Sequence, residues 1–236
     1  MITVIKLLLI GIHTIILSII ATFSALVDRS FKSYFFLTKI FSKGILFIAG
    51  VKVETINKNK IDNNSTYVFV SNHLSQFDIP VLQSAIPNRI AMIFKKELSR
   101  IPIFGWQLVL GPHIMVNRKS PESGMKSIEQ AKERMKAKGI SVLVFPEGTR
   151  SKTGDLLPFK RGAFHLASKI GAPIVPVTII NSEKIMPKGS FKLKRGNVKV
   201  IFNDPIDTSN IKSKPDEIQL MEKIKLTMLN NKENYR

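Results

Sequence analysis

Ser71-Asn72-His73-Leu74-Ser75-Gln76-Phe77-Asp78 is the stretch that decides the fold of this chain. The apolar, β-branched run before it, Thr66 to Val70, is typical of a buried strand. The residues after it, Ile79 to Leu82, are expected to form the body of a helix. His73 is therefore predicted to lie where a strand ends and a helix begins. Open α/β sheets bind their ligands at this edge, so the stretch indicates both a fold class and the place of a site.

The spacing of five residues between His73 and Asp78 limits how the two side chains can meet. Neighbours on a helix surface are three or four residues apart, so His73 must lie in a loop and Asp78 in the first helical turn. Ser75 supplies a helix start, as an N-cap followed by an acid three residues later. In that geometry the carboxylate would orient the imidazole and raise its basicity, so that the ring could accept a proton from a hydroxyl. The other interpretation is that Asp78 only completes a capping box and His73 is a polar loop residue. These residues alone do not decide between the two.

Length and composition limit the classes of protein to which this chain can belong. A chain of 236 residues fits one domain with a full core. It has no cysteine, which excludes a disulfide scaffold, a thiol nucleophile and a thiolate metal site. With 36 Lys and Arg against 17 Asp and Glu, the formal charge is +19, which indicates an anionic partner. Nucleic acid, an anionic membrane surface and a phosphorylated substrate all fit this charge. Low mean hydropathy excludes a transporter with many spans.

Two apolar stretches begin the chain. Leu7 to Val27 contains no charged residue and is long enough, at about twenty residues, to span a bilayer. A cleaved signal peptide is the alternative, and the apolar run is too long for one. Phe31 to Gly50 is rich in aromatic and aliphatic residues and is expected to form a second helix.

The second stretch carries its cationic residues on one side. Lys32, Lys39 and Lys43 fall on one helical face, which predicts a helix lying in the membrane interface. Arg29 and Lys32 would attract anionic head groups. We expect residues 1–50 to be a two-helix membrane-attachment unit, with the first helix either crossing the bilayer or lying in one leaflet. An ordinary buried pair of helices is the other interpretation.

The remainder of the chain alternates strands with helices, which predicts an α/β fold with a mixed, mostly parallel sheet flanked by helices. Helices are expected from Pro121 to Lys138, from Phe159 to Lys169, and from Pro215 onward. The last helix is expected to bury Ile218, Met221, Ile224 and Met228. The expected strands are Val51–Ile56, Thr66–Val70, Ala91–Phe94, His113–Val116, Ser141–Phe145, Ile174–Ile179 and Val198–Phe202.

Three of these strands end in polar loops. The polar side chains are His73 and Asp78 after the first, Arg118 after the second, and Glu147, Thr149 and Arg150 after the third. If the strands are parallel, the three loops share one edge of the sheet. Two arginines facing a histidine-carboxylate pair could bind a phosphate bidentately, and Lys95 could add a point charge. Such a site would move a group onto or off a hydroxyl beside a phosphate.

Other sites of known chemistry are excluded by residue type. The sequence contains no G-x-S-x-G elbow for a serine nucleophile and no G-x-x-x-x-G-K-[ST] phosphate loop. Its four histidines are far apart and lack zinc-site spacing, so no metal is expected. His13, His113 and His165 are interpreted as structural.

The pair of motifs resembles a known family. N-H-x-x-x-x-D at Asn72–Asp78, followed by Phe145-Pro-Glu-Gly-Thr-Arg150, is similar to the glycerolipid acyltransferase family. The best-known members of this family are 1-acylglycerol-3-phosphate (lysophosphatidate) acyltransferases. The blocks Lys95–Trp106, Phe159–Ala163 and Val175–Val177 resemble the same family, so the similarity covers about half of the chain.

The resemblance implies a glycerol-3-phosphate acyltransferase-like fold for residues 51–236 and a role for each matching residue. His73 would be the general base and Asp78 its orienting partner. The substrate-binding residues would be Lys95, Arg118, Glu147, Gly148, Thr149 and Arg150, with both arginines on the phosphate of the acceptor. The reaction would transfer an acyl group from acyl-CoA or acyl carrier protein to the free hydroxyl of lysophosphatidate, giving phosphatidate without a cofactor or a covalent enzyme intermediate.

The expected partners are lysophosphatidate, an acyl thioester and membrane lipids, with acyl carrier protein as one possible donor and no nucleic acid. The enzyme would be membrane-associated, with its catalytic domain on the cytoplasmic side. One alternative keeps the chemistry and changes the acceptor to glycerol 3-phosphate or another lysolipid. A second alternative is a non-catalytic basic module that binds membrane or nucleic acid, which leaves the spacing of His73 and Asp78 to chance.

Overall fold

The apolar runs predicted as strands form one seven-stranded sheet in the computed structural model, which describes residues 2–117 and 121–235. The strands are β1 (Val51–Ile56), β2 (Val68–Ser71), β3 (Ile90–Lys95), β4 (Ile114–Val116), β5 (Ser141–Val144), β6 (Ile174–Ile180) and β7 (Gly196–Phe202). Their order is β1-β7-β6-β2-β5-β3-β4. Only β6 and β7 pair antiparallel among these neighbours, so the predicted mixed, mostly parallel sheet is confirmed.

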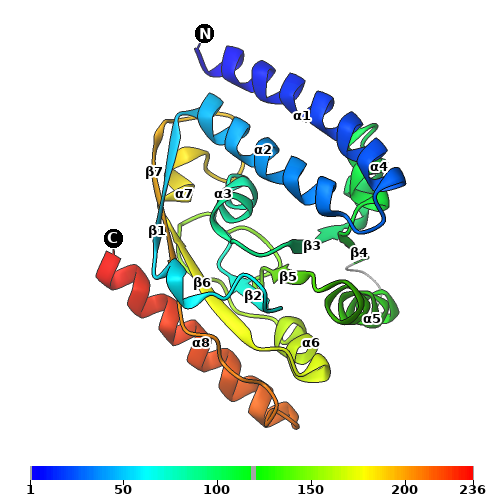
Figure 1. Ribbon diagram of the computed structural model, residues 1–236. Coiled ribbons are helices and arrows are strands. Elements are labelled where there is room, and N and C mark those ends of the chain that lie inside the picture. The colour runs from blue at the N-terminus through cyan, green and yellow to red at the C-terminus, as the bar shows by residue number, and fades with distance from the viewer. Residues whose placement is uncertain (1, 118–120, 236) are drawn as a thin grey trace.

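Helices cover both faces of this sheet (Figure 1). One face carries α2 (Lys32–Ala49) and α3 (Asp78–Ala85), and α1 (Ile2–Val27) lies outside α2. The other face carries α5 (Pro121–Lys138), α6 (Gly162–Ile170) and α8 (Lys214–Tyr235). The remaining helices are the short α4 (Phe104–Leu110) and α7 (Ser182–Ile185), with single 3₁₀ turns η1 (Lys58–Lys60) and η2 (Lys96–Arg100).

Alternation along the central strands divides the core into two layers. Val68 and Val70 of β2 pack into the cluster that contains the residues of α6 and α8, whereas Phe69 packs into the cluster under α2 and α3. Successive side chains of a strand point to opposite faces, and here both faces are buried. This explains why β2 reads in the sequence as an unbroken apolar run.

Pro176 lies inside β6 without disturbing the sheet. Its carbonyl accepts a hydrogen bond from the backbone N–H of Asn203, 3.0 Å away, just beyond the last paired residues of β6 and β7. The N–H that proline lacks would point to that same side, so the ladder between β6 and β2 loses no donor. Pro176 therefore limits pairing only where β7 ends.

Two predicted helix starts are wrong. Helix α3 begins at Asp78, and Ser75 is not its N-cap, because the hydroxyl of Ser75 donates to the Met186 carbonyl and accepts from the Phe77 N–H instead. Helix α6 begins at Gly162 rather than at Phe159. The backbone N–H of residue 160 bonds to the Pro146 carbonyl, 2.8 Å away, which holds the segment before α6 in a loop.

Two predicted orientations also differ from the structure. Ile218 of α8 is 41% exposed, because the buried stripe of this helix runs through Leu220, Ile224 and Met228 at four-residue steps. Lys39 does not share the outward side of α2 with the other two lysines. It is partly buried and donates to the carbonyl of Ile86, which ends α3.

Candidate active site

The His73 and Asp78 side chains meet as their spacing predicts. Strand β2 ends at Ser71, His73 lies in the following loop, and Asp78 is the first residue of α3. The Nδ1 atom of His73 is 2.7 Å from Oδ2 of Asp78, and the two side chains are 18% and 0% exposed. The described contacts of the imidazole use Nδ1, so Nε2 is the ring nitrogen that remains for a ligand.

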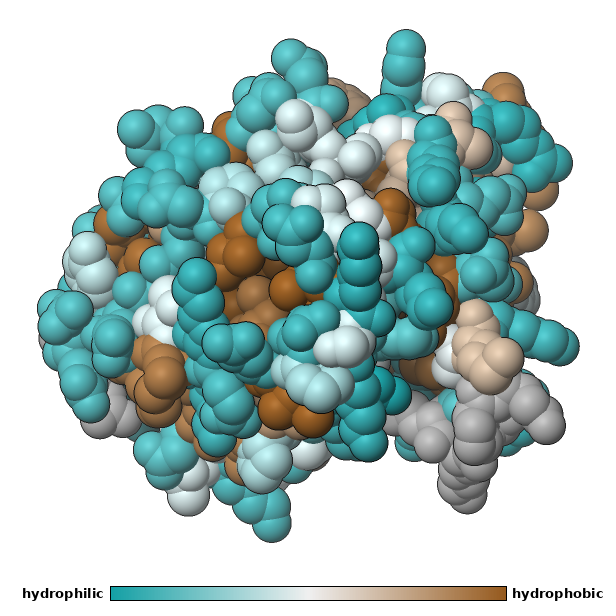
Figure 2. All heavy atoms as spheres, turned by 90° about the horizontal axis from the view of Figure 1, so that it is seen from below, coloured by the Kyte–Doolittle hydropathy of each residue, from teal (hydrophilic) through white to brown (hydrophobic). Residues whose placement is uncertain are grey.

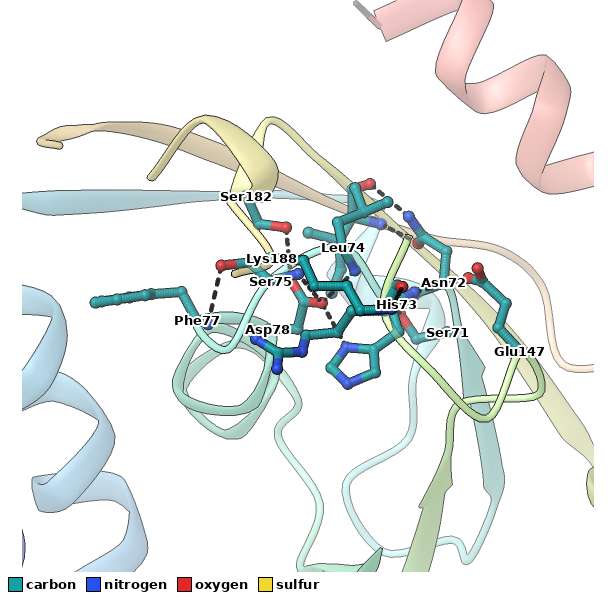
Figure 3. Close-up of polar contacts among 12 residues, drawn as sticks. Ser71, Asn72, His73, Leu74, Ser75, Phe77, Asp78, Glu147, Ser182 and Lys188 are labelled. Atoms are coloured by element: carbon teal, nitrogen blue, oxygen red, sulfur yellow. Dashed lines mark hydrogen bonds and ion pairs between the residues drawn. The ribbon is translucent and has the colours of Figure 1, made fainter. Parts of the chain in front are cut away.

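Asp78 is the centre of a larger set of hydrogen bonds (Figure 3). Its Oδ2 also accepts from the backbone N–H groups of Leu74, at 2.6 Å, and Ser75, at 2.8 Å. Its Oδ1 accepts from the Ser182 hydroxyl at 2.5 Å. A carboxylate only accepts hydrogen bonds, so all four donors can be satisfied together. Asp78 therefore turns the loop as a helix-start acid does and orients His73 at the same time, which joins the two interpretations left open by the sequence.

The imidazole of His73 rests on an aromatic ring. Phe145, the residue after β5, stacks on it with ring centroids 4.0 Å apart and an angle of 17° between the planes. One edge of the imidazole is fixed by Asp78 and one face by Phe145. The ring is therefore held in a single orientation, as a general base requires.

Glu147 fastens the neighbouring loop to His73. Its Oε1 accepts from the backbone N–H of His73 at 2.8 Å, and its Oε2 accepts from the N–H of Leu157 at 3.0 Å. Burial raises the pKa of Glu147, and the two backbone hydrogen bonds oppose that shift. Both oxygens of this buried side chain thus face the backbone, and the role in substrate binding that the resemblance implies for Glu147 stays a prediction.

The loop after Glu147 lies at the same edge of the sheet. Gly148 adopts φ +67°, a conformation that favours glycine. The Thr149 hydroxyl and the Arg150 carbonyl both accept from the ammonium of Lys188, at 3.1 and 2.7 Å. The backbone N–H of Ser151 donates to the carbonyl of His73 at 2.8 Å. Residues 147–151 are therefore attached to both backbone groups of the histidine.

Of the other two predicted cations, only Lys95 is among the described residues, and it belongs to β3, the neighbour of β5. Lys95 ends β3, is half exposed, and lies 3.2 Å from the carboxylate of Glu97. Arg118 lies outside the described residues. Because β2, β5, β3 and β4 are parallel neighbours, their carboxyl ends share one edge, as predicted. The described site residues are thus brought to a single rim.

Three residues of this rim were not predicted. The buried Asn72 side chain bridges from β2 to β6, donating to the Ile179 carbonyl at 2.9 Å and accepting from its N–H at 2.8 Å. Ser182 binds Asp78, and Lys188 binds the loop after Glu147. Asn72 stands inside the motif and its polarity in a buried run was a usable signal. The other two carry no local signal, because only the strand order brings them here.

The remaining histidines have partners within the fold. His13 lies 3.1 Å from the carbonyl of Phe41 in the adjacent helix. Burial lowers the pKa of His113 to about 4, and its Nδ1 accepts from the backbone N–H of Met92. His165 bonds to a carboxylate of α8 at 2.9 Å. Across residues 2–117 and 121–235, no group of three potential ligands is arranged to hold a metal ion.

A histidine held by a buried carboxylate at the rim of a mostly parallel sheet is an arrangement typical of an enzyme active site. Residues 52–180, more than half of the chain, match the family model described as Acyltransferase. The chain therefore belongs to the acyltransferase family, and the resemblance seen in its two motifs is confirmed.

Curated relatives and one solved structure agree with this assignment. A chloroplastic 1-acyl-sn-glycerol-3-phosphate acyltransferase of Brassica napus is 41% identical over 63% of this chain and 43% of its own length. The corresponding alpha enzyme of Homo sapiens is 31% identical over 78% and 65%. The chain spans about half the length of several curated relatives that it matches. The crystal structure of the 1-acyl-sn-glycerophosphate acyltransferase PlsC from Thermotoga maritima superposes with a TM-score of 0.84, at 24% identity, over 100% of this chain and 95% of that one, which shows the shared fold.

Proposed function

We propose that this protein is a 1-acylglycerol-3-phosphate acyltransferase, which transfers a fatty acyl group from an acyl thioester to the free hydroxyl of lysophosphatidate and so makes phosphatidate. The observation that carries the proposal is the oriented His73–Asp78 pair, which lies on one rim with the loop of Arg150. The names of the relatives support lysophosphatidate as the acceptor.

The chemistry follows from the free nitrogen of His73. With Nδ1–H directed at Asp78, Nε2 carries a lone pair that can accept the proton of the acceptor hydroxyl. The hydroxyl oxygen attacks the thioester carbonyl, the carbon–sulfur bond breaks, and the departing thiolate takes the proton from the imidazolium. General-base assistance contributes about 10²–10⁴-fold, so the positioning of both substrates must supply much of the remaining acceleration.

The cations of the rim are proposed to bind the acceptor phosphate. Arg150 and Arg118 would be its bidentate ligands, as the motifs imply, and Lys95 would add a charge from β3. Lys188 joins this set because its ammonium already donates to the Thr149 hydroxyl and to the Arg150 carbonyl. We assign Glu147 a positioning role, since both of its oxygens are bound to backbone N–H groups.

Residues 1–50 are proposed to attach the enzyme to a membrane, with residues 51–236 as the catalytic domain. By length and composition, α1 is sufficient to cross a bilayer, and its outward side chains are apolar. Cationic residues follow α1, at Arg29 and Lys32, and such residues beside a membrane segment favour the cytoplasmic side. We therefore propose that the catalytic domain lies on the cytoplasmic side, where acyl-CoA or acyl carrier protein would supply the acyl group.

A transfer assay tests this proposal. The purified full chain is given a radiolabelled acyl thioester, either of CoA or of acyl carrier protein. Lysophosphatidate, glycerol 3-phosphate and another lysophospholipid are tested as acceptors in separate reactions. Product is expected with lysophosphatidate, and His73→Ala is expected to abolish it without changing binding to vesicles. His165→Ala is the matched control, because His165 of α6 also bonds to a carboxylate, that of Glu217, and none of its described contacts reaches the His73–Asp78 pair.

Each other outcome has a definite meaning. Product only with glycerol 3-phosphate or another lysolipid would replace the acceptor and keep the chemistry. Turnover near the wild-type rate in His73→Ala would exclude the base assignment. No product with any pair of substrates, together with binding to nucleic acid that weakens steeply with salt, would favour a non-catalytic basic module.

A further inference from the structure

Helix α4 exposes an apolar face. Trp106, Val109 and Leu110 are three and four residues apart, so they share one side of the helix. Trp106 is 56% exposed and Val109 is 54% exposed. The other side of α4, with Gln107 and Leu108, is buried. A short helix that is well packed on one side and apolar on the other needs a partner for its second side, because burial of that surface is favourable.

The helix that carries this face lies beside the apolar N-terminal helix. Helix α4 packs against α1, close to the C-terminal end of α1 (Figure 1). Phe104 and Leu108 line one small apolar cavity together with Leu17 and Ala21 of α1, and the hydroxyl of Tyr34 in α2 donates to the Gln107 side chain. The outward residues of α1 are also large and apolar: Ile2, Val4, Ile5, Leu8, Leu9, Ile12, Ile15, Ile16, Ile19, Ile20, Phe23, Leu26 and Val27.

Cationic residues stand beside this surface. Lys96 and Arg100 are exposed in η2, the turn that leads to α4. Gly105 lets α4 lie close to that turn, since a Cβ at this position would be 2.4 Å from the Ser99 carbonyl oxygen. Seen from the side opposite to α1, the molecule is mostly hydrophilic (Figure 2). The apolar surface with its basic border is therefore the combination that an anionic lipid surface fits.

We propose that α4 and the turn before it are a third membrane-contacting segment, in which Trp106 lies at the level of the lipid head groups. Val109 and Leu110 enter the acyl region, and Lys96 and Arg100 bind lipid phosphates. The inference rests on the proposed attachment through residues 1–50 and adds a contact from the catalytic domain itself. It places the end of β3 next to the head groups, the depth at which the phosphate of a lysolipid lies.

The chain provides its own probe for this contact. Trp106 is its one tryptophan, so intrinsic emission reports this position alone. The full chain is transferred from detergent into vesicles of phosphatidylcholine with phosphatidylglycerol, with or without lipids brominated near the head-group end of the acyl chain. Emission is expected to move to shorter wavelength, and the brominated lipid is expected to quench it. Protein that pellets with the vesicles but is not quenched would overturn the third contact and leave the attachment through residues 1–50 intact. Protein that does not pellet would overturn both.

Two matched variants measure the contribution of α4. Val109→Asp is expected to weaken partition into the vesicles about tenfold and to reduce the quenching of Trp106. Leu226→Asp changes a residue of similar exposure, 58%, on α8 at the other side of the sheet, and is expected to leave both unchanged. Equal effects of the two substitutions would refute the proposal. A wavelength shift that follows protein concentration without lipid would refute it in favour of contact with a second copy of the chain.

Discussion

Replacing Asp78 by asparagine removes a charge while leaving a side chain of the same shape. The amide oxygen can take the place of Oδ2 and accept from the N–H groups of Leu74 and Ser75 and from His73, and the amide nitrogen can then donate to the Ser182 hydroxyl. In the reversed orientation the amide nitrogen would face two buried backbone N–H groups. Each of these donors would then lack an acceptor, which costs about 1–3 kcal/mol of stability per donor. The network therefore selects one orientation, and the histidine keeps its tautomer.

The loss in Asp78→Asn should therefore appear in the rate rather than in folding. We expect kcat to fall, by no more than the factor of about 10²–10⁴ that general-base assistance contributes, because the neutral amide no longer stabilises the protonated imidazole. The KM for lysophosphatidate should be nearly unchanged. The free energy of unfolding should fall by less than about 2 kcal/mol, because each buried donor keeps an acceptor. Asp78→Ala is the contrast, since it leaves two backbone N–H groups and one hydroxyl without their acceptor and should cost about 3 kcal/mol or more.

Initial rates and thermal unfolding of the two variants are the measurements. A folded Asp78→Asn enzyme with wild-type kcat would refute the role given to the carboxylate. Equal loss of stability in the two variants would show that the amide does not take up the orientation derived from the hydrogen bonds.

Three further changes test other parts of the structure. Glu147→Gln should keep only one of the two acceptors for backbone N–H groups and reduce the free energy of unfolding by about 1–3 kcal/mol. Chemical denaturation measures this loss, and kcat should fall because His73 is held less firmly. An unchanged stability would contradict the two hydrogen bonds. Asn72→Ala should leave both the N–H and the carbonyl of one residue of β6 unpaired and lower the melting temperature more than Glu147→Gln does, and the reverse order would contradict the bridge. Burial lowers the pKa of Lys39 from 10.5 to about 8, and nearby lysines add to this effect. Between pH 8 and pH 10.5, Lys39 is therefore protonated in the unfolded chain and neutral in the folded chain. The free energy of unfolding should therefore rise by up to about 3 kcal/mol from pH 8 to pH 10.5, and this gain should be lost as the pH falls back through 8. Melting curves of Lys39→Met should lack this pH dependence.

Local patterns predicted the parts of the fold that depend on local chemistry. All seven strands were expected from apolar runs, and the contact between His73 and Asp78 followed from helix periodicity. The errors at Ser75 and Phe159 have a common cause. In each case a backbone or hydroxyl group near the expected helix start bonds to a distant loop, and such partners are not visible in neighbouring residues.

The rest of the site depends on strand order. Ser182 is 104 residues from Asp78 in the chain, and Asn72 reaches Ile179 only because β6 lies beside β2. Periodicity shows which residues are strands but does not show which strands are neighbours. Glu147 illustrates a related limit, because an acid in a polar loop has the same sequence pattern whether its carboxylate faces solvent or backbone.

The double attachment of His73 to the loop of residues 147–151 has a mechanical consequence. The backbone N–H of His73 donates to Glu147, and its carbonyl accepts from the N–H of Ser151 in the same loop. A displacement of the segment that carries Arg150 must therefore also move His73. A change that makes this segment more rigid makes His73 more rigid as well. Under the proposed function, binding of the acceptor phosphate and alignment of the base are therefore coupled, so a lipid that fits poorly would also misalign His73.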